Sequence, residues 1–203
     1  MLKKVGSGIA AGIMVSIGGA VFLACESRIA GAVLFSVALL SICFAGYSLY
    51  TGKIGFIPEK HDKEAVSVLL TGLLGNTLGT ILCGLLIRYA FSASAETAET
   101  ICTAKLAQTF FGTLIRGTFC GILMYTAVKI YRDNKSPLGV LFCIPVFILS
   151  GFEHSVADIF YFAASGIVSV KAFGFILTVI LGNSIGGMLL PVLTGVLSKG
   201  DRE

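Results

Sequence analysis

Residues Ser150-Gly151-Phe152-Glu153-His154-Ser155-Val156-Ala157-Asp158 place three ionisable side chains between two apolar runs. The runs, residues 140–149 and 159–164, are each too short to cross a bilayer, which takes about 20 apolar residues. Joined, they are long enough, with the polar stretch near the middle. Charged groups at that depth are costly and usually face a cavity or a pathway. The stretch therefore predicts an interrupted membrane helix beside a pathway. The simpler alternative is a re-entrant turn whose glutamate and histidine only satisfy backbone groups.

The composition of the 203-residue chain is that of a membrane protein. Hydrophobic residues make up 56% of it and charged residues only 13%, against roughly 25% charged residues in typical globular chains. A chain of this length has room for about six spans. Its net charge of +4 does not indicate nucleic-acid binding, because the basic residues lie mostly between apolar segments. We therefore expect an all-α integral membrane protein in contact with lipid, with no nucleic-acid partner.

The cysteines and the first residues carry no sign of a metal site or a cleaved leader. The six cysteines are scattered, without a CxxC pair or a metal-ligand spacing, and are expected to pack as small apolar residues. No metal and no cofactor is predicted. Lys3 and Lys4 lead into an apolar run without a small-residue cleavage site, so that run is expected to be the first span.

Polar breaks divide the chain into six apolar segments. The second segment runs into a stretch between Gly46 and Gly55, where a continuous helix is not expected. Aqueous loops are predicted at residues 59–64 and 92–100. The six segments cover residues 6–25, 29–45, 65–89, 105–131, 140–164 and 172–197.

Basic residues at the ends of the spans predict the orientation in the membrane. With six crossings, nine of them fall on one side and four on the other, so both termini are expected in the cytoplasm. The nine are Lys3, Lys4, Lys60, Lys63, Lys129, Arg132, Lys135, Lys199 and Arg202, and the four are Arg28, Arg88, Lys105 and Lys171.

Landmarks recur along the chain at nearly one offset, which indicates an internal repeat. Each half has three crossings, an odd number, so the second half is expected to be inverted in the membrane. Interrupted helices at matching places in inverted repeats indicate a pathway at the repeat interface. The matching pairs are Gly12 with Gly117 and Gly46 with Gly151, both 105 residues apart, and Gly75 with Gly182, 107 residues apart.

We therefore predict two inverted three-helix repeats, at about residues 6–90 and 105–198, within a single channel domain of residues 1–203. The second and fifth helices are interrupted, as in an aquaporin-like fold. Gly46, Gly52 and Gly151 are expected to support the breaks.

Several short motifs together resemble the formate/nitrite transporter family of pentameric anion channels. The resemblance covers nearly the whole chain. It implies a homopentamer with one pore in each protomer, in the cytoplasmic (inner) membrane of a prokaryote. The motifs are residues 150–157, Leu49-Tyr50-Thr51-Gly52, Arg116-Gly117-Thr118-Phe119-Cys120, Gly75-Asn76 and residues 182–187.

The resemblance implies roles for individual residues. His154 corresponds to the central pore histidine, and Thr51 to its hydrogen-bond partner on the opposite loop. Lys105 corresponds to a lysine near the outer vestibule; the plainer alternative is a lysine at a span end that reaches the interface. The residues matching apolar constrictions or their borders are Leu39, Leu49, Phe35 and Phe147.

The resemblance does not fix the roles of the two acidic residues within 150–158, Glu153 and Asp158. Glu153 is expected to order the broken backbone by accepting N–H bonds. Asp158 has two open roles, the same one or a pairing with a basic residue. The chain also departs from the family pattern, which has Glu at Ser48, Asn at Gly121 and Asn at Asp158, while Lys53 replaces a common Asn.

These residues predict a channel for a small monovalent weak-acid anion, formate or nitrite, and no enzyme activity. An unpaired ion crosses an apolar constriction only at high cost, whereas its neutral acid crosses readily. A proton from His154, or from water connected to it, would convert one form to the other. Hydrosulfide is the alternative substrate. The alternatives of another class are a membrane metal-binding protein using Glu153, His154 and Asp158, and a purely structural membrane subunit.

Overall fold

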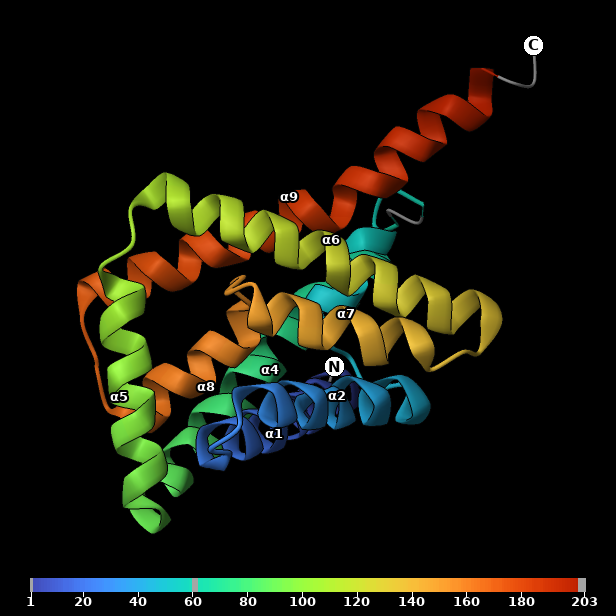
Figure 1. Cartoon of the computed structure of the whole chain (residues 1–203). Helices are drawn as coiled ribbons and strands as arrows, with labels where there is room; N and C mark the ends of the chain where they lie inside the picture. Colours follow the sequence, from blue (N-terminus) through green and yellow to red (C-terminus); the bar gives the residue numbers. More distant parts are fainter. Residues whose placement is uncertain (1, 60–61, 201–203) are drawn as a thin grey trace.

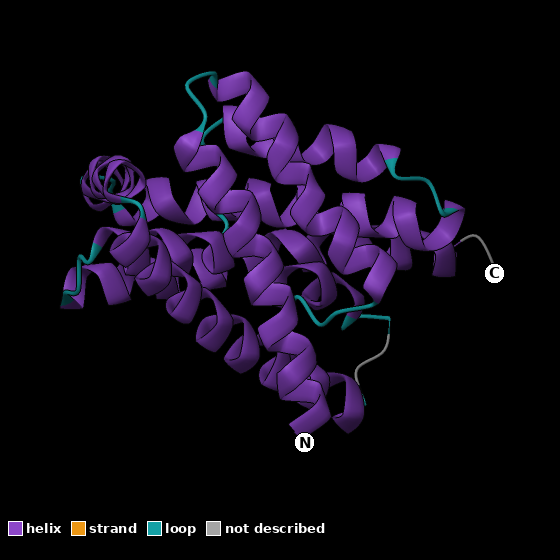
Figure 2. Ribbon diagram, turned by 90° about the horizontal axis from the view of Figure 1, so that it is seen from below, coloured by secondary structure: helices purple, strands orange, loops and turns teal. Residues whose placement is uncertain are grey.

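The computed structural model describes residues 2–59 and 62–200, and every regular element in these ranges is a helix (Figure 2). The prediction of an all-α fold is confirmed. In chain order the elements are α1 (Leu2–Ala24), α2 (Arg28–Ala45), α3 (Tyr50–Lys53), the short 3₁₀ turn η1 (Ile54–Phe56), α4 (Lys63–Ala90), α5 (Ser92–Leu106), α6 (Phe110–Asn134), α7 (Leu138–Leu149), α8 (Ser155–Ser165) and α9 (Val170–Gly200).

Five of these helices are long and apolar enough to cross a membrane: α1, α2, α4, α6 and α9. The fifth segment, predicted as an interrupted helix, consists of two short apolar helices, α7 of 12 residues and α8 of 11 residues, which are separated by residues 150–154. Many large apolar side chains on the long helices are exposed, for example Leu70, Leu74 and Leu78 on α4. A water-soluble surface rarely carries so much apolar area, so the chain is an integral membrane protein.

The helices form two groups with the broken pair between them. Figure 1 shows α1, α2 and α4 on one side and α6 and α9 on the other, with α7 and α8 in the middle and α5 across one end. Helix α7 packs against α2 and α6, and helix α8 packs against α4 and α5. The middle of the molecule is therefore made by the two short helices and the chain break that joins them.

One predicted loop is wrong. Residues 92–100, expected in water, belong to helix α5, which continues to Leu106. Its small residues Ala95, Ala98 and Cys102 recur on one face and are buried, which makes the segment amphipathic despite its polar composition. The following span begins at Phe110 rather than at residue 105, because the Thr109 side chain caps α6 by accepting the Gly112 N–H at 3.1 Å.

Glycines allow the long helices to pack in close pairs, α1 on α4 and α6 on α9. A Cβ atom on Gly12 would lie 2.5 Å from the carbonyl oxygen of Asn76, and one on Gly182 would lie 2.6 Å from that of Leu114. No larger residue fits at these contacts without moving a backbone. Such close approach is what drives helix association in lipid.

The helices are interrupted by two short non-helical segments, residues 46–49 and 150–154, which we call the chain breaks. Each contains a glycine with left-handed backbone geometry near its start. Gly46 has a φ of 71° and ends α2, and Gly151 has a φ of 68° just after α7. Side chains with a Cβ rarely adopt this conformation. The chain then runs through a few non-helical residues before α3 and α8 begin.

A buried asparagine holds the first break. Asn76 on α4 donates from Nδ2 to the carbonyl oxygens of Ser48, at 2.9 Å, and Gly8, at 2.8 Å. Its Oδ1 accepts the backbone N–H of Tyr50 at 2.8 Å. One side chain therefore satisfies both the carbonyl group and the amide group that the break leaves without helical partners.

A second asparagine does the same for the second break. Asn183 on α9 donates from Nδ2 to the carbonyl oxygens of Glu153, at 2.8 Å, and Gly117, at 2.9 Å. Its Oδ1 accepts the N–H of Ser155 at 2.9 Å. Asn76 and Asn183 are both fully buried. Since lipid offers no water to replace these bonds, the breaks depend on the two asparagines.

We predict that Asn183→Ala strongly destabilises the fold. The substitution leaves the buried carbonyl group of Glu153 and the buried N–H of Ser155 without a partner, and each unsatisfied group costs about 1–3 kcal/mol. The total expected loss is about 3 kcal/mol or more. The measurement is the thermal unfolding midpoint in a mild detergent. Asn134→Ala, at the exposed end of α6, is the matched control and should unfold close to wild type. Equal midpoints for the two variants would contradict the role of Asn183.

Candidate functional site

Two cavities and a narrow apolar section share lining residues inside the molecule. The larger cavity, about 540 Å³, is lined by Lys105, Asp158 and His154 among others, and we call it the Lys105 cavity. The smaller one, about 290 Å³, is lined by Lys53, Arg132 and Lys135 among others, and we call it the Lys53 cavity. Between them lies a space of only about 10 Å³, which we call the narrow section.

Shared lining residues connect the three spaces. Phe35, Phe147 and His154 line both the Lys105 cavity and the narrow section. Leu39 and Leu49 line both the narrow section and the Lys53 cavity. The four residues expected at the constrictions and the central histidine therefore line adjoining spaces, which we call the path, in the order that runs from one cavity to the other.

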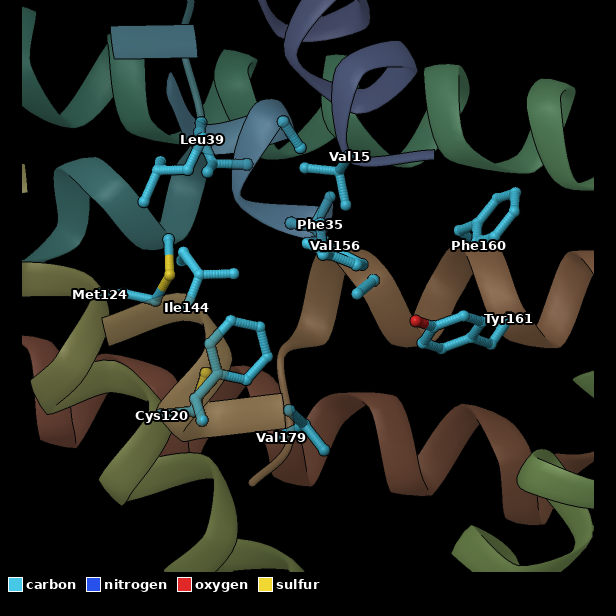
Figure 3. Packing of buried hydrophobic residues seen from close by; sticks show 14 of the residues in the cluster. Val15, Phe35, Leu39, Cys120, Met124, Ile144, Val156, Phe160, Tyr161 and Val179 are labelled. Carbon is cyan, nitrogen blue, oxygen red and sulfur yellow. The ribbon is translucent and has the colours of Figure 1, made fainter. Parts of the chain in front are cut away.

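The narrow section is apolar. Among the described residues that line it, only His154 is polar, and the others include Val15, Met124 and Ile144. Figure 3 shows Leu39, Met124 and Ile144 close together, on three different helices. An ion that entered here would lose its water without gaining charged partners, which costs several kcal/mol or more.

His154 is fixed at the start of helix α8 by both of its ring nitrogens. Nδ1 accepts the N–H of Ala157 at 3.1 Å and so caps the helix. Nε2 lies 2.7 Å from Oγ1 of Thr51, across from the other chain break. The Phe147 ring stacks on the imidazole with a centroid distance of 5.8 Å, and Phe35 meets Phe147 edge-on at 6.2 Å.

These bonds assign the ring proton. Because Nδ1 accepts a backbone N–H, it carries no proton, and the proton of the neutral ring is on Nε2. His154 then donates to Thr51. A second proton on Nδ1 would break the helix cap, so this geometry favours the neutral ring.

A buried ion cluster lies beside the histidine in the Lys105 cavity. Nζ of Lys105 bonds Oε2 of Glu153 and lies 2.9 Å from Oδ1 of Asp158. Gln108 donates from Nε2 to Oε1 of Glu153 at 2.7 Å. Burial lowers the pKa of Lys105, but the charges of Asp158 and Glu153 outweigh it and raise the pKa above that of an ordinary lysine. The ammonium group therefore stays charged.

The cluster shows that the role predicted for Glu153 is wrong, and it chooses between the two roles left open for Asp158. Glu153 was expected to accept backbone N–H bonds, but its carboxylate bonds the side chains of Lys105 and Gln108, and Asn183 orders the broken backbone instead. For Asp158, two roles were open, and the structure places it against Lys105. Lys105 itself is only 13% exposed, so it is not a lysine that reaches the membrane interface.

The remaining predicted residues lie close to the path. Gly46 and Gly52 line the Lys53 cavity, and Gly151 lines the Lys105 cavity. Ser48, one of the departures from the family pattern, is buried and bonds Ser7. Gly121 packs against the backbone of α9 without room for a side chain.

Sequence reasoning assigned no role to Asn76, Asn183 or Gln108. The sequence does indicate the two asparagines, because each follows a glycine in an apolar segment and the two pairs occupy matching positions of the repeats. No such pattern indicates Gln108, since it lies 45 residues from its partner Glu153.

The metal-binding alternative gains no support. Within residues 2–59 and 62–200, no group of three or more His, Cys, Asp and Glu side chains is placed to hold a metal ion. His61, together with Lys60 and Arg202 from the orientation argument, lies outside the described residues.

Several known proteins are similar to this chain in sequence. A family model described as Formate/nitrite transporter matches residues 1–197. The chain is 28% identical over 189 residues to an uncharacterized transporter, YwcJ, of Bacillus subtilis (84% of this chain, 70% of YwcJ). It is 25% identical over 175 residues to the nitrite transporter NirC of Salmonella typhimurium. The second match covers 76% of this chain and 65% of NirC, just under two thirds of that protein.

Solved structures show the same fold at lower sequence identity. A pentameric formate channel with formate bound superposes with a TM-score of 0.80 at 22% identity, over 98% of this chain and 97% of that one. An FNT family ion channel superposes with a TM-score of 0.78 at 21% identity, over 97% of this chain and 88% of that one.

We predict that Lys105→Met destabilises the protein by about 3–5 kcal/mol, because it removes the cation from two buried carboxyl groups. The measurement is the unfolding midpoint in detergent, and adding Glu153→Gln to the variant should recover part of the loss. Lys129→Met is the matched control. Lys129 also pairs with a carboxylate, Asp133 at 2.8 Å, but both side chains are about 40% exposed, and such pairs contribute about 0–1 kcal/mol. Equal effects of the two lysine substitutions would show that the buried cluster contributes no more than a surface pair.

Proposed function

The chain belongs to the formate/nitrite transporter family, and on that premise we propose that it conducts a small weak-acid anion, formate or nitrite, across a membrane. NirC, a nitrite transporter, and the structure of a formate channel with formate bound support this substrate class. No observation favours hydrosulfide over them. Permeation of this kind involves no covalent step, so the proposed protein is a channel and not an enzyme.

The proposed channel is a single domain of two inverted repeats, with six crossings in which the second and fifth helices are interrupted. In the second proposed repeat, the first long helix, α6, begins at Phe110. The equivalent bonds of Asn76 and Asn183 to the two breaks support this symmetry. We further propose a homopentamer in the inner membrane of a prokaryote with both termini in the cytoplasm, supported by the pentameric formate channel and by the basic residues at the span ends.

The proposed permeation has two stages. The anion is drawn into the Lys105 cavity towards the Lys105 ammonium, and there it takes up a proton beside His154. The neutral acid then crosses the narrow section between Leu39 and Leu49 and loses the proton in the Lys53 cavity. The apolar lining supports this order, because it admits a neutral molecule far more easily than an ion.

The observation that carries the proposal is the hydrogen bond between His154 and Thr51. It joins the two chain breaks at the point where the polar cavity meets the narrow section. His154 lines both the Lys105 cavity and the narrow section, so the ring that Thr51 holds in place lies where a small acid would leave the charged cluster. Elsewhere the narrow section presents carbon and sulfur atoms only to a solute.

We predict that His154→Asn retains the fold but alters the pH dependence of flux. Asparagine is also a good N-cap residue, so helix α8 keeps its start, but the shorter side chain does not reach Thr51 and is expected to let the bare anion pass. In liposomes, wild-type formate flux should rise as the pH falls, by up to about tenfold per pH unit, following the protonated fraction of a weak acid. The variant should show a flatter profile.

Flux of formate and nitrite is measured at several pH values, with protein-free liposomes and Asn134→Ala as controls. Identical pH profiles for wild type and His154→Asn would mean that the histidine is only structural.

A further inference from the structure

The ion cluster in the Lys105 cavity does not balance if all its groups are ionised. It holds one ammonium group, on Lys105, and two carboxyl groups, on Glu153 and Asp158. Their side chains are 13%, 3% and 2% exposed. An uncompensated negative charge at such a buried place costs several kcal/mol. Two carboxylates that share one site avoid it by keeping one proton between them.

The hydrogen bonds distinguish the two carboxyl groups. Both oxygen atoms of Glu153 have a donor, Oε2 from Lys105 and Oε1 from Gln108. Asp158 uses only Oδ1, which lies 2.9 Å from the Lys105 ammonium. Its Oδ2 is buried and has no hydrogen-bond partner in the part of the chain that the structure describes. The unpartnered oxygen belongs to a residue that lines the cavity together with His154.

The histidine is poorly placed to supply the proton itself. Its Nδ1 is occupied by the Ala157 N–H, and its Nε2 by Thr51. Transfer of the single Nε2 proton would leave an imidazolate anion in an apolar wall, which is strongly unfavourable. The proton that neutralises the anion therefore comes from another group in the cavity.

Apart from Glu153, whose two oxygen atoms both accept hydrogen bonds, no group around Asp158 is a comparable acid. The other titratable neighbours are an amine, two thiols and a phenol, none of which releases a proton readily near neutral pH. On α4, Arg88 bonds the carbonyl of Ser165 at the far end of α8, and on α9 the nearest basic residue, Lys171, is at the exposed first turn. The titratable groups that interact with Asp158 are Lys105 and Cys102 from α5, Cys120 from α6, Glu153 from the chain break and Tyr161 from α8 itself.

We propose that Asp158 carries a proton on Oδ2 and is the residue that protonates the permeating anion in the Lys105 cavity. The Oδ2–H bond breaks and an O–H bond forms on formate or nitrite, which leaves as the neutral acid. The Asp158 carboxylate that remains is held by Lys105 and regains a proton from the solution on the side from which the anion entered, so that one proton is consumed there for each molecule of acid that leaves. This inference rests on the proposed function, because it names the source of the proton that the proposed permeation needs.

The same proton explains how an anion approaches the cluster at all. With both carboxyl groups ionised, they would outweigh the Lys105 charge and repel an incoming anion. With Asp158 protonated, the Lys105–Glu153 pair is neutral, and the anion meets an O–H donor beside an ammonium group. Once the proton has left, the new Asp158 carboxylate competes with the anion for Lys105, which favours departure of the neutral acid towards His154.

The test combines infrared spectroscopy of the reconstituted full-length protein with formate flux. Wild type at neutral pH should show the carbonyl stretch of a protonated carboxyl group. Asp158→Asn, which has nearly the same shape but cannot titrate, should lose this band, while Lys105→Met combined with Glu153→Gln, which removes one charge of each sign and leaves Asp158 as a lone buried carboxyl group, should keep it. Formate flux in Asp158→Asn should fall at least about tenfold, equivalent to about 1.4 kcal/mol of barrier, and should lose its rise at low pH.

Several results would overturn the inference: no such band in wild type, a band that survives in Asp158→Asn or disappears in the Lys105→Met, Glu153→Gln double variant, or an unchanged flux profile in Asp158→Asn. The proposed function fails differently. Wild-type formate and nitrite flux no higher than in protein-free liposomes would overturn it, while a band lost only in Asp158→Asn would still support the proton on Asp158. Size-exclusion chromatography confirms that each variant assembles as wild type does.

Discussion

The structure depends on two buried asparagines that satisfy the backbone at two chain breaks. Inside a bilayer every peptide group needs a protein partner, so a membrane helix can be interrupted only where another side chain replaces its lost bonds. Asn76 and Asn183 each bond a carbonyl group and the amide two residues later. The interruptions bring Thr51 and His154 within hydrogen-bond distance of each other, and His154 lines both the Lys105 cavity and the narrow section. Without the breaks, both residues would lie within continuous helices.

The path has a polar part and an apolar part, which meet at His154. On one side of His154 lies a polar cavity with the buried cluster of Lys105, Glu153 and Asp158, and on the other lies a narrow section without charged side chains among the described residues. An anion is stabilised in the first region and a neutral molecule in the second. The boundary between them is therefore the place where a proton must be gained or lost. The cluster can supply that proton because its two carboxyl groups exceed its one ammonium group.

Local patterns in the sequence predicted much of this arrangement. Ionisable residues and glycines inside apolar runs indicated both breaks, and hydropathy indicated the spans. The failures have physical reasons. Residues 92–100 were predicted to be a loop because their composition is polar. They form a helix because small residues on one face of it pack against the rest of the molecule. The ion pair between Lys105 and Asp158 joins residues 53 positions apart (158 − 105), so no local pattern showed that Asp158 would meet a lysine or that Glu153 would bond side chains instead of the backbone. The asparagines were visible as a recurring motif, but their partners were not.

The central claim is that the anion crosses the narrow section as a neutral acid. The most direct measurement records formate flux into liposomes together with internal pH, from a trapped dye, and membrane potential. The account predicts that internal acidification accompanies formate uptake, with one proton delivered for each formate, and that no membrane potential develops. Formate uptake that generates an inside-negative potential without acidification would show that the bare anion crosses, and would contradict the account.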